Sequence, residues 1–226
     1  MTKYSLALHT TSSELGLAIS NFAGDSRCLV KDLGRELSTQ LHQYLAEFIQ
    51  PQTWADLAFI AVAKGPGSFT GTRIGVVTAR TLAQQLEIPL FAISTLAAVA
   101  YSQQFVGAGY TNQLAEPRNI SLNPPPRGDI AVQLNAHRGE IFTAIYQVSS
   151  DDSGLIELLP DNVMKPDVWQ KTLETWPNSY QLIKAENNLG ASVLELLELA
   201  YLDWQKGLHP HWSEAIPFYG QHPVDS

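Results

Sequence analysis

An N-terminal strand hairpin followed by alternating strands and helices constrains the fold of this chain most. Residues 4–9 are short, apolar and strand-like, and the alternating apolar side chains of residues 15–19 predict a strand that returns beside them. Residues 27–31 predict a third strand. Further strands at 57–63 and 90–93 then alternate with helices. This order indicates a mixed sheet covered by helices, which is an α/β fold.

The first two predicted helices carry apolar side chains in different patterns. The first has apolar residues at spacings of four, four and three, and it ends at Pro51. The second, which ends near Glu87, is apolar nearly all round, so we expect it to be buried on two sides. One side faces the sheet, and the other faces either a helix of this chain or another molecule. The apolar residues are Leu37, Leu41, Leu45 and Phe48 in the first helix, and Ile74, Val76, Val77, Ala79, Leu82, Ala83 and Leu86 in the second.

The order of strands and helices is that of ribonuclease-H-like domains, and the opening pattern returns later in the chain. Residues 130–134 and 141–148 predict a second hairpin. We therefore expect a duplicated ribonuclease-H-like fold, as in the actin-like ATPases (the ASKHA group), with two lobes of mixed sheets flanked by helices. A shift of 126 positions pairs Leu8 with Leu134, Glu14 with Glu140, Ala18 with Ala144, Ile19 with Ile145, and Asp25 with Asp151.

Composition divides the chain into two lobes and an insertion. Residues 1–104 form the first predicted lobe, and residues 129–189 form the second. Residues 105–128 contain four prolines and few apolar side chains, which is typical of a surface insertion or linker. A last helical pattern lies within residues 190–226, and we expect it to pack back on the first lobe.

Charge and cysteine content exclude several classes of protein. The net charge is −8, from 14 Lys and Arg against 22 Asp and Glu in 226 residues. This argues against a protein that grips nucleic acid by itself, since phosphate contacts need clustered cations. A single cysteine, Cys28, excludes an internal disulfide framework. No signal peptide pattern and no stretch of about 18 apolar residues is present, so we expect a cytoplasmic protein without a membrane association.

A glycine-rich loop between the strand at 57–63 and the second helix is the most specific motif. Glycine allows close approach of the backbone, and the start of a helix favours anions. The loop is not a Walker loop, because no Gly-Lys-Ser/Thr ends it. It is therefore either a phosphate-facing or partner-facing loop, or a connection that merely needs glycine. The residues concerned are Gly65, Pro66, Gly67, Ser68, Phe69, Thr70, Gly71 and Arg73.

The sequence predicts no catalytic residue and no metal site. Ribonuclease-H-like nucleases and actin-like ATPases place carboxylates at their hairpins to manage divalent metal and phosphate. Here the first strand ends in His9, and its counterpart in the second hairpin is Asn135. His209 and His211 lie near the C-terminus without further ligands nearby in the sequence, and we interpret them as solvated side chains.

Several segments of the chain resemble the TsaB family, also called YeaZ. The most specific of them is the glycine-rich string at 65–75. Residues 6–10 resemble the family's first strand, and residues 36–41 its first helix. Residues 135–142 are similar to its Asp-Ala-Arg-Arg-Gly-Glu segment, and residues 217–219 sit where the family has a Pro-x-Tyr-Leu-Arg element.

This resemblance implies a role in tRNA modification without catalysis by this chain. The family takes part in making threonylcarbamoyladenosine beside the anticodon of tRNAs that read codons starting with A. It implies a heterodimer with TsaD, joined by the ATPase TsaE, and a homodimer through the same helical surface. It implies no cofactor bound by this chain alone, with ATP at the junction with TsaD and TsaE, and tRNA bound only through the complex.

His9, Asn135 and Thr72 depart from the family pattern, which usually has carboxylates at the first two positions and Leu at the third. These departures weaken any expectation of intrinsic nucleotide binding. The competing hypothesis is an autonomous actin-like small-molecule kinase or ATPase, which rests on the glycine-rich loop and an expected cleft between lobes. The resemblance predicts the partner interface at Leu37, Leu41, Leu45, Phe48, Ile74, Val77 and Thr78.

Overall fold

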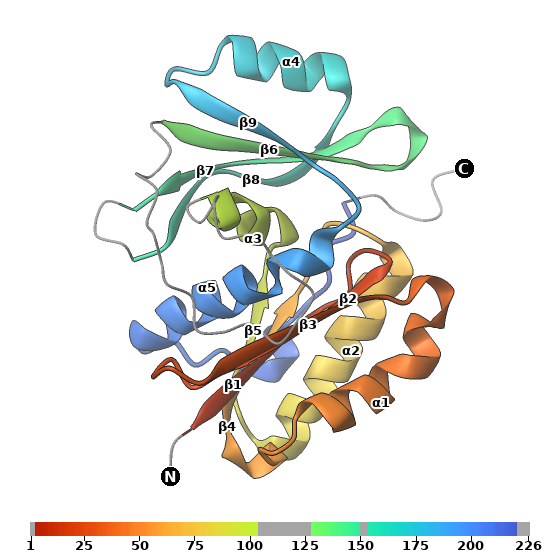
Figure 1. The fold of residues 1–226 in the computed structure, drawn as a ribbon. Helices are drawn as coiled ribbons and strands as arrows, with labels where there is room; N and C mark the ends of the chain where they lie inside the picture. The colour runs from red at the N-terminus through yellow and green to blue at the C-terminus, as the bar shows by residue number, and fades with distance from the viewer. Residues whose placement is uncertain (1–2, 104–127, 150–152, 221–226) are drawn as a thin grey trace.

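The computed structural model describes residues 3–103, 128–149 and 153–220. Within these ranges two sheets lie one above the other, with helices between them and on both outer faces (Figure 1). Each sheet opens with an antiparallel hairpin whose first strand also pairs in parallel with a later strand. The duplicated α/β fold expected from the sequence is confirmed. The predicted insertion at 105–128 lies outside the described residues, except for Gly128.

The first sheet consists of β1 (Tyr4–His9), β2 (Glu14–Ser20), β3 (Ser26–Asp32), β4 (Leu57–Ala63) and β5 (Leu90–Ile93). The strand order is β3-β2-β1-β4-β5. Strands β1, β2 and β3 pair antiparallel, whereas β1, β4 and β5 pair in parallel. Strand β4 is apolar throughout because both of its faces are covered.

The second sheet consists of β6 (Asp129–Asn135), β7 (Ile141–Val148), β8 (Leu155–Met164) and β9 (Tyr180–Ala185), in the order β8-β7-β6-β9. Sequence analysis predicted the hairpin β6–β7 but neither β8 nor β9. Strand β8 carries Pro160 and many exposed side chains, so its sequence lacks a clear alternation of apolar and polar residues. Both missed strands lie at edges of the sheet, where one side of the strand is unpaired.

Helices form three layers around the two sheets (Figure 1). The outer face of the first sheet is covered by α1 (Leu37–Phe48) and α2 (Phe69–Leu86). Between the sheets lie α3 (Thr95–Ser102) and α5 (Val193–Gln205), and α4 (Pro166–Glu174) covers the outer face of the second sheet. None of the helices in the described ranges is long and apolar enough to cross a membrane.

The alternation of side chains along β1 assigns one face of the first sheet to each helix layer. Leu6 and Leu8 pack with α1 and α2, whereas Ala7 packs with α5 on the opposite face. Ala18 and Ala61, from the two neighbouring strands, join Ala7. These small side chains leave room for α5 close to the sheet, so the chain's last long helix packs on the first sheet although it follows the second.

Candidate functional site

The glycine-rich loop connects β4 to α2 and packs directly on the β1–β2 turn. A Cβ atom at Gly67 would lie 2.2 Å from the carbonyl oxygen of Thr11, and one at Gly71 would lie 2.1 Å from that of Thr10. A Cβ atom at Gly75, in the first half of α2, would lie 2.1 Å from Oγ1 of Thr10. Because the neighbours of Gly67 and Gly71 include backbone atoms, these two glycines are required for the loop to approach the turn, whereas a Cβ atom at Gly75 would displace the Thr10 side chain.

Hydrogen bonds fix this contact between the loop and the turn. The Ser68 N–H donates to the Thr11 carbonyl oxygen at 2.7 Å, and the Thr10 hydroxyl donates to the Gly71 carbonyl oxygen at 2.8 Å. The Ser68 hydroxyl accepts from the Gly71 N–H at 3.2 Å and so caps α2. Of the two alternatives left open by the sequence, internal packing therefore accounts for Gly67 and Gly71. Ser68, Phe69 and Thr70 remain exposed.

A C-terminal segment, residues 212–220, also contacts this loop. The Phe218 N–H donates to the Lys64 carbonyl oxygen at 2.6 Å, and the ring centroids of Phe69 and Tyr219 are 4.5 Å apart. A Cβ atom at Gly220 would lie 2.5 Å from Cγ2 of Val163, on the second sheet. The C-terminal segment thus touches the start of α2 and the second lobe at once.

The outward face of α2 carries one row of exposed side chains. Phe69, Arg73, Val77 and Thr81 recur every four residues, so they lie on one side of the helix. Phe69 is 38% exposed and Val77 is 54% exposed, so two of the four side chains in the row are large, apolar and open to solvent. The second apolar side expected from the pattern of α2 is therefore partly open to solvent, and Val77 is its most exposed large apolar side chain.

A groove of about 470 Å³ lies between the outward row and α1. Ile74, Val77 and Thr78 contribute to it, as sequence analysis predicted for an interface. Sequence analysis missed the contribution of α1, where Ser38 and His42 each follow one residue after a leucine of the inward stripe. The groove is lined by Ser38, His42, Arg73, Ile74, Val77, Thr78, Thr81 and Leu82.

Three predicted interface residues on α1 do not face outward, and the prediction is wrong for them. Leu37, Leu41 and Leu45 are 5%, 0% and 3% exposed and belong to the core between α1 and the first sheet. Their spacing marks the face that an amphipathic helix turns toward its own sheet, so these three side chains offer no surface to a partner. Phe48 is partly buried, with the Arg27 guanidinium 5.2 Å from its ring centroid.

The two lobes are joined by a buried polar cluster at the start of α3. The Ser94 hydroxyl donates to Oδ1 of Asp161 at 2.8 Å, and the Tyr146 hydroxyl donates to the same oxygen at 3.0 Å. Ser94 also caps α3 by accepting from two backbone N–H groups. Burial raises the pKa of the Asp161 carboxyl, although these two hydrogen bonds and Lys64 favour its charged form. The cluster ties β8 to the end of β5 and was not foreseen from the sequence.

The positions where related folds place carboxylates differ from each other here. His9 is fully buried on the α5 side of the first sheet, and neither ring nitrogen has a hydrogen-bond partner among the described residues. Burial lowers its pKa to about 3, so the imidazole is neutral at physiological pH. Asn135 ends β6 and is exposed. In the described ranges, no three His, Cys, Asp or Glu side chains are grouped to hold a metal ion.

His209 and His211 lie at the other end of α2 from the glycine-rich loop. They line a separate groove of about 660 Å³ beside the end of α2. The His209 ring packs edge-on against Trp204 at 4.4 Å between centroids, and Nδ1 of His211 is 2.7 Å from the Ser213 hydroxyl. Both side chains are exposed, as expected for solvated histidines.

Comparisons with known proteins converge on one family. A family model described as TsaD, tRNA N6-adenosine threonylcarbamoyltransferase, matches residues 33–121. A Bacillus subtilis (strain 168) protein named tRNA threonylcarbamoyladenosine biosynthesis protein TsaB is 32% identical over 197 residues, which cover 84% of this chain and 74% of the relative. A TsaB of Buchnera aphidicola subsp. Schizaphis graminum (strain Sg) is 50% identical over 167 residues, covering 74% and 68%.

A solved structure described as YeaZ from Pseudomonas aeruginosa has the same fold. It superposes with a TM-score of 0.70 at 19% sequence identity, and the match covers 96% of this chain and 100% of that one. At this identity the likeness concerns the fold alone. The two lobes and their helix layers are therefore arranged as in an experimentally determined structure.

Proposed function

The chain belongs to the TsaB family, and on this premise we propose that it is a non-catalytic subunit of the machinery that makes threonylcarbamoyladenosine in tRNA. Its proposed partner is TsaD. The TsaD family model matches residues 33–121, a stretch that contains α1 and α2. A TsaD chain therefore has a comparable pair of helices, and two such pairs pack face to face by fitting ridges into grooves.

The observation that carries this proposal is the outward row on α2 beside an open groove. Val77 is 54% exposed in the middle of the row, and the groove next to it is walled by α1. A partner helix that packs on the outward row, with side chains entering the groove, removes the apolar surface of Val77 and Ile74 from water, which favours association by roughly 25 cal/mol per Å² of buried apolar area. Arg73 is also exposed, so we expect a carboxylate opposite it on the partner.

In this proposal TsaD carries out the chemistry and this chain holds it in its active arrangement. TsaD transfers the threonylcarbamoyl group to the adenosine beside the anticodon of tRNAs that read codons starting with A. The net charge of −8 suits a subunit that leaves the tRNA phosphates to its partners. We expect TsaE and ATP at the junction with TsaD, near Ser68 and Thr70, which are exposed in this chain. Without TsaD, a second copy of this chain occupies the same face.

The competing hypothesis of an autonomous kinase or ATPase has less support. Close packing on the β1–β2 turn already explains why positions 67 and 71 are glycine, so Gly67 and Gly71 are not evidence for a phosphate site. His9 is a neutral, buried side chain where related folds use a carboxylate. Calorimetry of the purified chain with Mg-ATP discriminates between the two hypotheses. Nucleotide turnover by this chain alone would establish the rival.

The test of docking is a charge placed in the outward row. We expect Val77→Asp to weaken binding to the TsaD of the same genome by about 100-fold or more, because the carboxylate becomes buried without a partner. Titration calorimetry measures the affinity, and gel filtration measures complex formation. Thermal denaturation should show that the variant is folded, since the side chain is exposed in the free chain.

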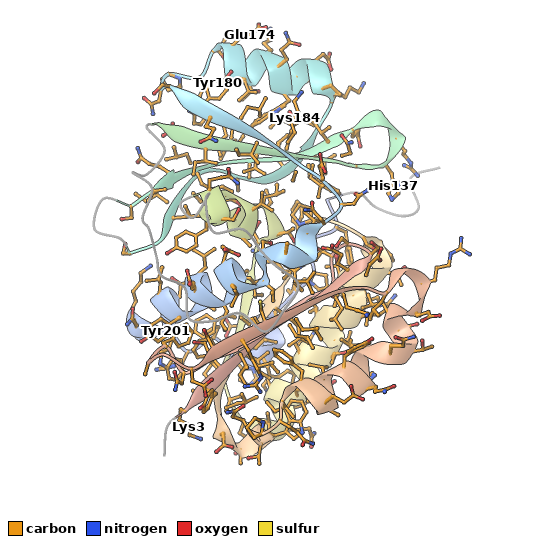
Figure 2. The ribbon with its side chains drawn as sticks, viewed as in Figure 1. Lys3, His137, Glu174, Tyr180, Lys184 and Tyr201 are labelled. Atoms are coloured by element: carbon orange, nitrogen blue, oxygen red, sulfur yellow. The ribbon has the colours of Figure 1, made fainter. Side chains whose placement is uncertain are left out.

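The matched control is Val168→Asp. Val168 is 48% exposed on α4, which lies at the opposite end of the molecule from α1 and α2 (Figure 1). Glu174 on α4 and Tyr180 at the start of β9 lie at that end (Figure 2). This variant should bind TsaD as the unaltered chain does. Equal affinity of both variants would refute the proposed interface.

A further inference from the structure

We propose that the C-terminal segment is part of the docking surface, and that the partner helix lying on α2 also covers Ile216 and the Phe69–Tyr219 pair. This inference rests on the proposed function, because it assigns a second contact region to the same partner. Sequence analysis placed the interface on α1 and α2 alone.

The C-terminal segment runs alongside α2 in the opposite direction. Near its beginning, the Arg80 guanidinium lies 5.8 Å from the ring centroid of Trp212. Near its end, Tyr219 packs on Phe69, at the first residue of α2. Between these points Ala215 is buried in the same core cluster as the inward side of α2. The segment therefore flanks α2, with contacts to it near both ends.

Ile216 is the most exposed large apolar side chain among the described residues, at 68%. A single exposed isoleucine has no significance by itself. Here, however, its neighbour Ala215 is 1% exposed, and the N–H of Phe218 is held by Lys64 at 2.6 Å. Ile216 is thus an exposed side chain on a segment that flanks α2, and its backbone is fixed before binding, which lowers the entropy cost of using it in an interface.

The geometry of helix packing indicates why the same partner covers both regions. A helix with its side chains is about 10–12 Å wide, and packed helices lie about 8–10 Å apart. Packed helices also cross at an angle, most often about 20° or about 50°, so a helix centred on the outward row extends past α2 on both sides along its length. On one side it meets the groove against α1, and on the other it meets the C-terminal segment. The partner surface should be apolar opposite Val77 and Ile216, with a carboxylate near Arg73 between them.

The deciding experiment compares TsaD binding by Ile216→Asp and Leu208→Asp in titration calorimetry. Leu208 is 51% exposed and precedes the C-terminal segment, where its N–H bonds to Asp203 at the end of α5. We expect Ile216→Asp to weaken binding at least about tenfold, and Leu208→Asp to change it less than about twofold. Thermal denaturation checks the fold, and Ile216→Ser provides a milder variant that should weaken binding in the same direction.

Hydrogen exchange provides an independent readout on the unaltered chain. The backbone N–H groups of residues 214–216, 218 and 219 should exchange more slowly when TsaD is added. Unaltered exchange there, or full affinity of a folded Ile216→Asp variant whose Val77→Asp counterpart has lost binding, would overturn the inference and leave the proposed function standing. Full affinity of both variants would instead refute the proposed function. Loss of self-association alone, with TsaD binding intact, would assign the C-terminal segment to a homodimer and also overturn the inference.

Discussion

Helices α1 and α2 lie side by side on the first sheet, yet they use their apolar side chains differently. The stripe of α1 is buried in the core, with Leu41 fully inaccessible. Helix α2 packs Val76 and Ala79 on the sheet and keeps a second set, including Val77, on its outward side. Only apolar side chains that do not pack on the sheet, such as Val77, indicate a partner. The difference shows that a helical stripe alone does not distinguish a core from an interface.

The largest expected effect tests the buried half of this comparison. We expect Leu41→Ala to lower the free energy of unfolding by about 2–5 kcal/mol, because it opens a cavity in a fully buried site. Val77→Ala on the outward row should change it by less than about 0.5 kcal/mol. Urea denaturation of both variants measures the difference. Similar losses of unfolding free energy in the two variants would contradict the difference between a buried stripe on α1 and an exposed row on α2.

A second test concerns the inner face of the first sheet, where His9 is buried. Its pKa is about 3 in the folded chain and about 6.5 when exposed, so the unfolded state takes up a proton first as the pH falls. Stability associated with neutral His9 is complete above pH 6.5 and is lost as the pH falls toward 3. At pH 4.5 the loss is about 3 kcal/mol.

The readout for His9 is the pH dependence of unfolding compared with that of His9→Gln, which does not titrate. Carboxylates also titrate near pH 4.5, and subtracting the curve of the variant removes their contribution. Identical pH profiles would mean that water reaches the imidazole and that this face of the sheet is not sealed.

A third and smaller effect tests why α2 lies where it does. Gly71→Ala places a Cβ atom 2.1 Å from the Thr10 carbonyl oxygen, so backbone must shift. Overpacking of this kind costs about 1–3 kcal/mol of stability. Thr70→Ala, at the exposed neighbouring position, should stay within about 0.5 kcal/mol of the unaltered chain. A Gly71→Ala variant as stable as the unaltered chain would argue against the tight contact and return the glycine to a role in ligand binding.

Much of the fold was predictable because it depends on local patterns. The alternation of residues 15–19 and the continuous apolar run of β4 each identify a strand and its surroundings. The second lobe was harder beyond its hairpin. The apolar side chains of β8 are partly exposed, and the short helix α4 buries Trp169 and Leu173 against β6 and β7, where the Trp169 indole N–H donates to Oε1 of Gln133. Such long-range contacts leave no local signal.

The candidate site was predictable on α2 and not on α1 or the C-terminal segment. Val77 and Ile74 were identified because α2 carries more apolar residues than one face holds. His42 and Ser38 are polar and fall between the leucines of α1, so nothing in their type marks a groove. Ile216 becomes notable only when Ala215 beside it is seen to be buried and Tyr219 is seen to pack on Phe69.

The most direct test of the account is the dissociation constant of the TsaD complex for Val77→Asp, measured beside the unaltered chain under the same salt conditions. An outward row that serves as the docking face predicts an increase of about 100-fold or more, with the variant's melting temperature unchanged. A dissociation constant equal to that of the unaltered chain would contradict the account, because the exposed side of α2 would then remain uncovered in the complex.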